Sequence, residues 1–167
     1  LSKQAGTFQM RLAGAAISPG YEVNDLGFQS RADRFVVDTR FTYKETVPGS
    51  IFRSWEVRGG PDMIWNYGGD RVFSQFNVLT DWELTNYWSG GTTLRYDFRG
   101  DNDRLTRGGP LAKDPRGVSA RINVQTDREQ PFLVSASYDW ASDKAGSGRN
   151  AASLRLLVAV QSNWEIS

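Results

Sequence analysis

Any chemistry done by this 167-residue chain must rest on carboxylates, lysine, arginine or tyrosine, because the sequence contains neither histidine nor cysteine. Without histidine there is no Ser-His-Asp or Cys-His arrangement, and the commonest general base and metal ligand is missing. Without cysteine there is neither a disulfide nor a thiolate metal site. A pair of carboxylates, as glycoside hydrolases use, is the hydrolytic option that remains. We predict that the chain is not an enzyme and keep a carboxylate-based glycoside hydrolase as a remote alternative.

Two sets of carboxylates are candidates for chemistry. Asp81 and Glu83 stand two residues apart and therefore share one face of a strand. We interpret them as charges that line a wet interior rather than as an acid–base pair. Asp33, Asp101 and Asp103 could bind calcium, but they lack the spacing of an EF-hand, so we interpret them as solvated loop residues. The sequence predicts no metal site and no cofactor.

Composition narrows the class of protein. Lys plus Arg is 20 and Asp plus Glu is 19, a net charge of +1 that gives no support to a nucleic-acid partner. Aromatic residues make up 13% of the chain, with six tryptophans, although the mean hydropathy is −0.50. No stretch approaches the roughly 20 apolar residues of a transmembrane helix. A soluble all-β domain and a membrane β-barrel remain.

The elements that would position these residues are β-strands. Apolar and polar residues alternate with a period of two along most of the chain, and no helical periodicity competes with this pattern. Arg53 interrupts the apolar face of the third strand, and we interpret it as a bulge or an interfacial position. The eight predicted strands are residues 7–17, 34–45, 50–58, 70–84, 88–99, 117–126, 131–141 and 151–166.

Long and short connections alternate between these strands. This layout is typical of an up-and-down barrel with short turns on one rim and long loops on the other. The predicted long loops are residues 18–33, 59–69 and 100–116, and residues 142–150 are predicted to form a loop of moderate length. The short turns lie near residues 48–49, 85–87 and 127–130.

The alternation has two interpretations. In a soluble β-sandwich or small barrel, the apolar face would point into a core. In a membrane barrel, it would face lipid, and three features favour this. First, the strands reach about 10 to 15 residues, against about 5–6 in soluble sheets and 9–11 for crossing a bilayer. Second, charges of both signs occupy the opposite face in mid-strand. These predicted lumen-facing charges are Arg11, Asp38, Arg40, Asp81, Glu83, Arg95, Asp97, Arg121 and Arg155.

Third, aromatic residues gather at the strand ends, as they do at the two interfaces of a bilayer. Small residues on the apolar face are also compatible with fluid lipid, whereas they would leave holes in a packed core. The predicted aromatic girdle is Tyr43, Trp82, Trp88, Phe98, Trp140 and Trp164.

Two stretches carry a family resemblance. Residues 20–28, Gly-Tyr-Glu-Val-Asn-Asp-Leu-Gly-Phe, and residues 103–110, Asp-Arg-Leu-Thr-Arg-Gly-Gly-Pro, resemble two signature loops of an uncharacterised bacterial outer-membrane β-barrel domain. In that family the barrel usually follows a module similar to carbohydrate-binding family nine, and it is several hundred residues long. The resemblance therefore implies an outer-membrane location. We predict that residues 1–167 form one β-barrel segment of about eight strands, a fragment of a larger barrel.

The two resembling loops contain candidate binding residues. The first could bind a sugar or a cation, although its Asx and Gly residues also suit a plain turn. The second could place a cation over the lumen as part of a plug or constriction, and it too suits a loop turn. These loop-motif residues are Asn24, Asp25, Gly27, Arg107, Gly108, Gly109 and Pro110.

We predict from this a non-enzymatic outer-membrane barrel that forms a pore or anchors a carbohydrate-binding module. Its expected partners are outer-membrane lipid, carbohydrate, and the remainder of a larger barrel or other envelope proteins. The alternative is a soluble all-β domain that binds carbohydrate or another ligand and uses Trp55, Trp65 and Trp140 as stacking platforms.

Overall fold

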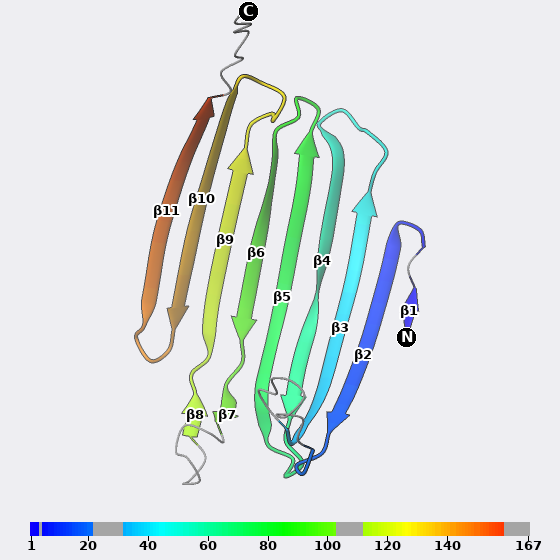
Figure 1. Ribbon diagram of the computed structural model, residues 1–167, viewed down its shortest axis with the longest axis vertical. Helices are drawn as coiled ribbons and strands as arrows, with labels where there is room; N and C mark the ends of the chain where they lie inside the picture. Colours follow the sequence, from blue (N-terminus) through cyan, green and yellow to red (C-terminus); the bar gives the residue numbers. More distant parts are fainter. Residues whose placement is uncertain (4, 22–31, 103–111, 159–167) are drawn as a thin grey trace, which may run out of the picture.

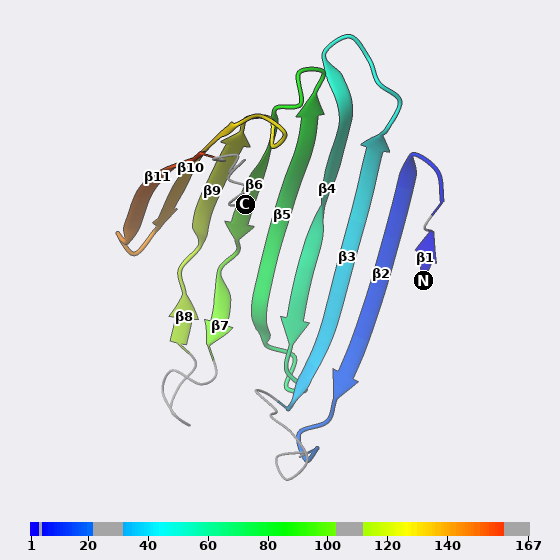
Figure 2. The same cartoon turned by 45° about the horizontal axis from the view of Figure 1, so that its top comes forward.

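The computed structural model describes residues 1–3, 5–21, 32–102 and 112–158, and these residues form one layer of antiparallel strands with no helix (Figures 1 and 2). The main sheet has nine strands in the order β1-β2-β3-β4-β5-β6-β9-β10-β11, and β7 pairs with β8. The strands are β1 (Ser2–Lys3), β2 (Phe8–Ile17), β3 (Arg34–Glu45), β4 (Phe52–Trp65), β5 (Arg71–Leu84), β6 (Ser89–Asp97), β7 (Gly100–Asn102), β8 (Ala112–Asp114), β9 (Gly117–Gln125), β10 (Phe132–Asp143) and β11 (Gly148–Val158).

The all-β, antiparallel part of the predicted fold is confirmed, because every pair of neighbouring strands is antiparallel. Eight long strands, of 9 to 14 residues, correspond to the eight that the sequence predicts. The short strands β1, β7 and β8 were not predicted, and β7–β8 lies inside the predicted loop 100–116. Within the described residues β1 and β11 do not pair with each other, so the sheet is open.

The predicted loop at residues 59–69 is wrong, because β4 continues to Trp65. Gly59 and Gly60 look like strand breakers, but each lies against a neighbouring backbone where a Cβ atom would not fit. The true connection is a tight turn closed by Asn66 and Asp70. Asp70 N donates to Asn66 Oδ1 at 2.8 Å, and Asn66 Nδ2 donates to Asp70 Oδ2 at 2.9 Å.

The predicted loop at residues 142–150 is also wrong. β10 ends at Asp143 and β11 begins at Gly148, so only four residues connect them. Asp143 Oδ1 accepts hydrogen bonds from the backbone N–H groups of Ala145 at 2.8 Å and Ser147 at 2.9 Å. These two hydrogen bonds close the turn. The long loops thus do not alternate strictly with short turns.

The register of the sheet keeps apolar side chains on one face from β2 to β11, called here the apolar face, and polar side chains on the other, the polar face. In one cross-strand row Val78 lies opposite Leu94, Leu94 opposite Ala120, and Ala120 opposite Trp140. Cross-strand partners share a face. Each strand therefore adds to the same two surfaces.

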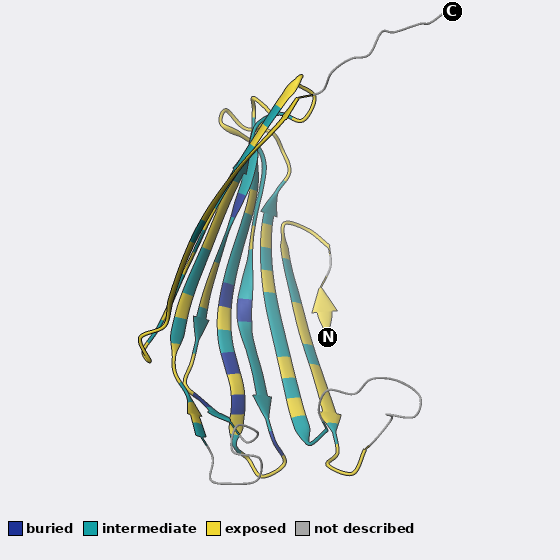
Figure 3. Cartoon of the chain, turned by 60° about the vertical axis from the view of Figure 1, so that its left-hand side comes forward, coloured by how far each residue is buried: buried dark blue, intermediate teal, exposed yellow. Residues whose placement is uncertain are grey.

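Most of the apolar face is not covered by the described residues. Phe76, Leu94, Ile122 and Val158 are 43%, 49%, 51% and 53% exposed. Among the described residues Val72 is the one buried hydrophobic residue, and Figure 3 shows how little of the sheet is buried. This part of the chain therefore has no hydrophobic core of its own.

Arg53 occupies a β-bulge, as one of the two sequence interpretations proposed. Phe52 pairs with Leu84 and Ser54 with Glu83, which leaves Arg53 as the extra residue of β4. The bulge lets the Arg53 guanidinium reach Glu83 on the polar face, with Nη1 and Oε1 at 3.2 Å. The bulge thus removes the charge from the apolar face.

The polar face is the concave face of the sheet. In β3 the apolar-face residues Phe41 and Tyr43 are exposed. Their chain neighbours on the polar face, Arg40 and Thr42, are half-buried. One hollow of about 610 Å³ also reaches from Lys44 on β3 to Arg128 beyond β9. On a flat sheet these strands would lie about 20 Å apart, at about 4.8 Å per strand. Side chains therefore converge on the polar face and diverge on the apolar face.

Candidate functional site

The polar face collects the charged side chains that the sequence singled out. All nine predicted lumen-facing charges lie on this one face. This follows from the register, because residues that pair directly across two strands point to the same side of the sheet. Arg11 lies opposite Arg40, and Arg95 lies opposite both Asn77 and Ser119.

An acidic row crosses the sheet toward the end that carries the β4–β5 turn. Asp38 lies opposite Asp62, Asp62 opposite Gln75, and Gln75 opposite Asp97. Like charges directly opposite each other repel, so these carboxylates need partners. Asp62 Oδ2 accepts hydrogen bonds from Gln75 Nε2 at 2.7 Å and from Asn77 Nδ2 at 2.8 Å. Asp38 faces Arg11, with Oδ1 and Nε at 3.9 Å.

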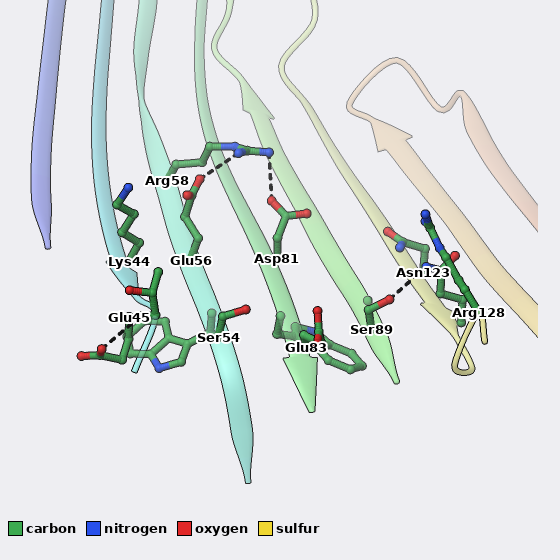
Figure 4. Close-up of a pocket in the computed structure, with 15 residues that line it drawn as sticks. Lys44, Glu45, Ser54, Glu56, Arg58, Asp81, Glu83, Ser89, Asn123 and Arg128 are labelled. Atoms are coloured by element: carbon green, nitrogen blue, oxygen red, sulfur yellow. Dashed lines mark hydrogen bonds and ion pairs between the residues drawn. The ribbon is translucent and has the colours of Figure 1, made fainter. Parts of the chain in front are cut away.

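A second set of charges lies toward the opposite end of β4 and β5. Arg58 connects the two strands: its Nη1 lies 2.8 Å from Glu56 Oε1 and its Nη2 lies 2.9 Å from Asp81 Oδ2 (Figure 4). Arg53 pairs with Glu83 and lies over the ring of Tyr87, 4.3 Å from its centroid. The guanidinium forks thus join carboxylates of neighbouring strands.

These charges border the 610 Å³ hollow shown in Figure 4. On its far side the Gln125 amide, in the orientation that satisfies its neighbours, accepts hydrogen bonds from Ser89 Oγ at 2.9 Å and from Arg128 Nε at 2.8 Å. The lining contains both signs of charge, amides and hydroxyls. Such a surface can hold water and polar solutes. The lining residues are Lys44, Glu45, Thr46, Ser54, Trp55, Glu56, Arg58, Asp81, Trp82, Glu83, Ser89, Gly90, Asn123, Gln125 and Arg128.

The candidate acid–base pair of the hydrolase alternative lies in this hollow. Asp81 and Glu83 do share the polar face of β5, as their spacing predicted. Each is engaged by an arginine, Asp81 by Arg58 and Glu83 by Arg53. The geometry therefore accounts for both carboxylates as members of cross-strand ion pairs, and the prediction of no enzyme activity stays a prediction.

Sequence reasoning missed the residues of β4 that organise the polar face. Glu56 and Arg58 were assigned to a less regular strand, and Asp62 to a loop. The signal that could have found them is the parity of β4. Val57, Gly59 and Met63 fall on the apolar face, so Glu56, Arg58 and Asp62 fall on the polar face.

Aromatic side chains lie near both ends of the apolar face. At the end with the β3–β4 turn, Tyr43 contacts Trp55 with ring centroids 5.3 Å apart, and Trp55 lies opposite Trp82. At the other end Phe35 stacks on Tyr67 at 4.2 Å.

Of the remaining predicted girdle residues, Trp88 lies beside the first of these ends, directly before β6, and Trp140 lies near the second, opposite Ala120 and Asn150. Phe98 meets Tyr96 edge-on at 4.8 Å, also at the second end. Trp164 lies outside the described residues. The stacking platforms of the soluble alternative, Trp55, Trp65 and Trp140, have their cross-strand partners on the apolar face. Trp55 also borders the 610 Å³ hollow.

Both loop motifs lie outside the described residues, so Asn24, Asp25, Gly27, Arg107, Gly108, Gly109 and Pro110 have no structural account. Across the described ranges no group of three or more acidic side chains is close enough to hold a metal ion. The same ranges contain no helix long and apolar enough to cross a membrane.

Comparison with known protein families decides the affiliation of the chain. Residues 1–166 match the family described as "Domain of unknown function (DUF5916)". The chain belongs to this family. No curated protein and no solved structure matches it. Membership of DUF5916 confirms the predicted resemblance to an uncharacterised domain family. The bacterial outer-membrane location and the accompanying carbohydrate-binding module stay predictions.

Proposed function

We propose that the chain is part of an outer-membrane β-barrel, with the apolar face against lipid and the polar face around an aqueous lumen. In this proposal the protein is not an enzyme and acts as a pore for polar solutes or as a membrane anchor. Its partners are outer-membrane lipid and the further strands or envelope proteins that complete the barrel.

The direction of curvature is the observation that carries this proposal. Soluble barrels and sandwiches place apolar side chains on the enclosed, concave side of the sheet, where they form the core. Here the concave side holds the ion pairs of Arg58 and Arg53, and the convex side holds exposed residues such as Leu94 and Ile122. A polar interior with an apolar exterior is the arrangement of a transmembrane barrel.

Strand length supports the same assignment. β3 and β10 have 12 residues each, and at about 3.4 Å per residue they extend about 40 Å. Tilted by about 40°, such strands rise about 30 Å, which matches the hydrocarbon thickness of a bilayer. The aromatic contacts at both ends of the apolar face suit the two interfaces of that bilayer.

Backbone hydrogen bonding supports a barrel that is completed by further strands. In hydrocarbon every backbone N–H and C=O group needs a protein partner, so a lipid-facing sheet cannot keep an open edge. The outer edge of β11 is unpaired in the described residues. Strands from the remainder of the polypeptide or from another copy would supply the missing bonds.

Folding in the presence and absence of lipid tests the proposal. We expect urea-unfolded full-length protein to gain β-sheet circular dichroism when it is diluted into phosphatidylcholine vesicles. It should then migrate differently on unboiled and boiled electrophoresis samples. In plain buffer the exposed apolar face should drive aggregation. A monomeric, cooperatively folded protein in buffer without lipid or detergent would contradict the proposal and favour a soluble ligand-binding domain.

A further inference from the structure

A second hollow on the polar face, of about 300 Å³, lies over β6, β9, β10 and β11 and is distinct from the hollow of Figure 4. These four strands lie side by side (Figure 1). We propose that this hollow is a binding site for a small phosphate ester, held by Arg95, Arg121 and Arg149. The site goes beyond the proposed function, because it depends on the register of four strands and not on what covers the opposite face.

The floor of the hollow is made of small residues with arginines at its ends. Arg95 on β6 lies opposite Ser119, Ser119 opposite Ala141, and Ala141 opposite Arg149 on β11. Three strand spacings of about 4.8 Å separate the two arginine backbones by about 14 Å. The side chains of Ser119 and Ala141 are small and leave the space between the two arginines free, so the two long arginine side chains can meet over this floor.

Arg121 supplies the third guanidinium. It lies two residues beyond Ser119 on β9, opposite Thr93 on one side and Asp139 on the other. Arg121 Nε donates a hydrogen bond to Asp139 Oδ1, and this carboxylate also lines the hollow. The terminal nitrogens of Arg121 remain available to a ligand, because Arg carries five donors in a fixed fork.

The charges of the hollow do not balance. Three arginines and one aspartate line it, which leaves a net charge of 3 − 1, or +2. Within the described ranges the side chains of Arg95 and Arg149 form no hydrogen bond or ion pair with another protein group, whereas those of Arg53 and Arg58 on the same face are both paired with carboxylates. Two unpaired guanidiniums facing one cavity produce a positive potential that a dianion would neutralise.

The chemistry of the lining selects the class of anion. Guanidinium forks bind phosphate oxygens bidentately, and the hydroxyls of Thr93 and Ser119 add neutral donors beside them. A phosphate monoester carries a charge of about −2 near neutral pH, which matches the net charge of the site. A volume of about 300 Å³ is at the small end of ligand pockets, so a three- to six-carbon ester fits better than a polymer.

Calorimetric titration of the full-length protein in detergent tests this proposal, with glycerol 3-phosphate as the probe and glycerol as its uncharged control. We expect glycerol 3-phosphate to bind and glycerol not to bind. Arg95→Gln and Arg149→Gln should each weaken binding roughly tenfold, the effect of losing one charge-assisted contact. Arg155→Gln is the matched control, because Arg155 lies on the same strand and face as Arg149 but outside the hollow.

Asp139→Asn should increase the affinity for glycerol 3-phosphate, an effect that is not expected if the arginines of the hollow have a purely structural role. It releases Arg121 and raises the net charge of the hollow by one, so glycerol 3-phosphate should bind severalfold more tightly. Equal binding of glycerol, or equal loss of binding in Arg155→Gln and Arg149→Gln, would overturn the proposal. The vesicle-folding test on the same preparations keeps the two proposals separate. Phosphate binding without lipid insertion would reject only the membrane assignment, and insertion without phosphate binding only this site.

Discussion

Leu94→Arg is expected to destabilise the protein in a lipid bilayer by about 2–4 kcal/mol, the cost of an arginine on the lipid face near the midplane. Leu94 lies in the middle of β6 on the apolar face, between Val78 and Ala120. It is 49% exposed in the structure. If water covered this face, a polar substitution there would change the free energy of unfolding by no more than about 0.5 kcal/mol. The measurement is urea unfolding of the vesicle-inserted protein.

Thr93→Arg is the control for this prediction. Thr93 is the chain neighbour of Leu94 on the polar face, opposite Arg121 and Leu79. An arginine there would lie in a wet, charged environment, and we expect a change within about 1 kcal/mol. Equal effects of Leu94→Arg and Thr93→Arg would show that the two faces do not differ in environment, which contradicts the account.

Gly60→Ala is expected to lower the free energy of unfolding by about 3 kcal/mol or more, because among the described glycines an added Cβ would make its closest contact here. A Cβ at Gly60 would overlap the carbonyl oxygen of Thr39 on β3, and a backbone atom cannot move aside as a flexible side chain can. The neighbouring Gly59 has the same constraint on the β5 side, from the carbonyl oxygen of Asn77. Unfolding in denaturant measures the change.

Gly14→Ala is the matched control, a glycine of β2 on the same sheet. A Cβ atom added at Gly14 would have the Val36 carbonyl oxygen as its nearest neighbour, at 3.6 Å, which is an ordinary van der Waals contact. This substitution should change stability by less than about 1 kcal/mol, because glycine in a strand is itself unfavourable. A loss at Gly60 no larger than that at Gly14 would mean that β4 does not run between β3 and β5 as described.

The sequence predicted the strands whose alternation is uninterrupted. For β3 the predicted range and the observed one, Arg34–Glu45, are the same. From Val37 to Lys44, β-branched and aromatic residues alternate with polar ones, so local preference and pairing agree. The face of each charge also followed from parity alone, since a strand has a strict period of two.

The predicted loops were wrong where strand pairing overrode the local conformational preference of the residues. Gly59 and Gly60 favour a turn in isolation, but between β3 and β5 the absence of side chains is what allows β4 to continue. Likewise the polar residues 142–150 looked like a loop, whereas a side-chain cap by Asp143 closes a four-residue turn. Neither outcome is visible without knowing which strands are neighbours.

The partners of each charge were also beyond sequence reasoning. The contact of Arg58 with Asp81 depends on the relative register of β4 and β5, and a shift of one residue would move either side chain to the opposite face. The 300 Å³ hollow that we propose binds a phosphate ester likewise depends on the register of four strands, from Arg95 on β6 to Arg149 on β11.

Spin-label accessibility along β9 tests most directly whether the convex face contacts lipid. Because the chain has no cysteine, single cysteines at residues 118–124 would each give one labelled site. In vesicle-inserted full-length protein, we expect labels at Val118, Ala120, Ile122 and Val124 to collide mainly with lipid-soluble oxygen. Labels at Ser119, Arg121 and Asn123 should collide mainly with a water-soluble nickel chelate. The absence of this alternation, or its reversal, would contradict the account.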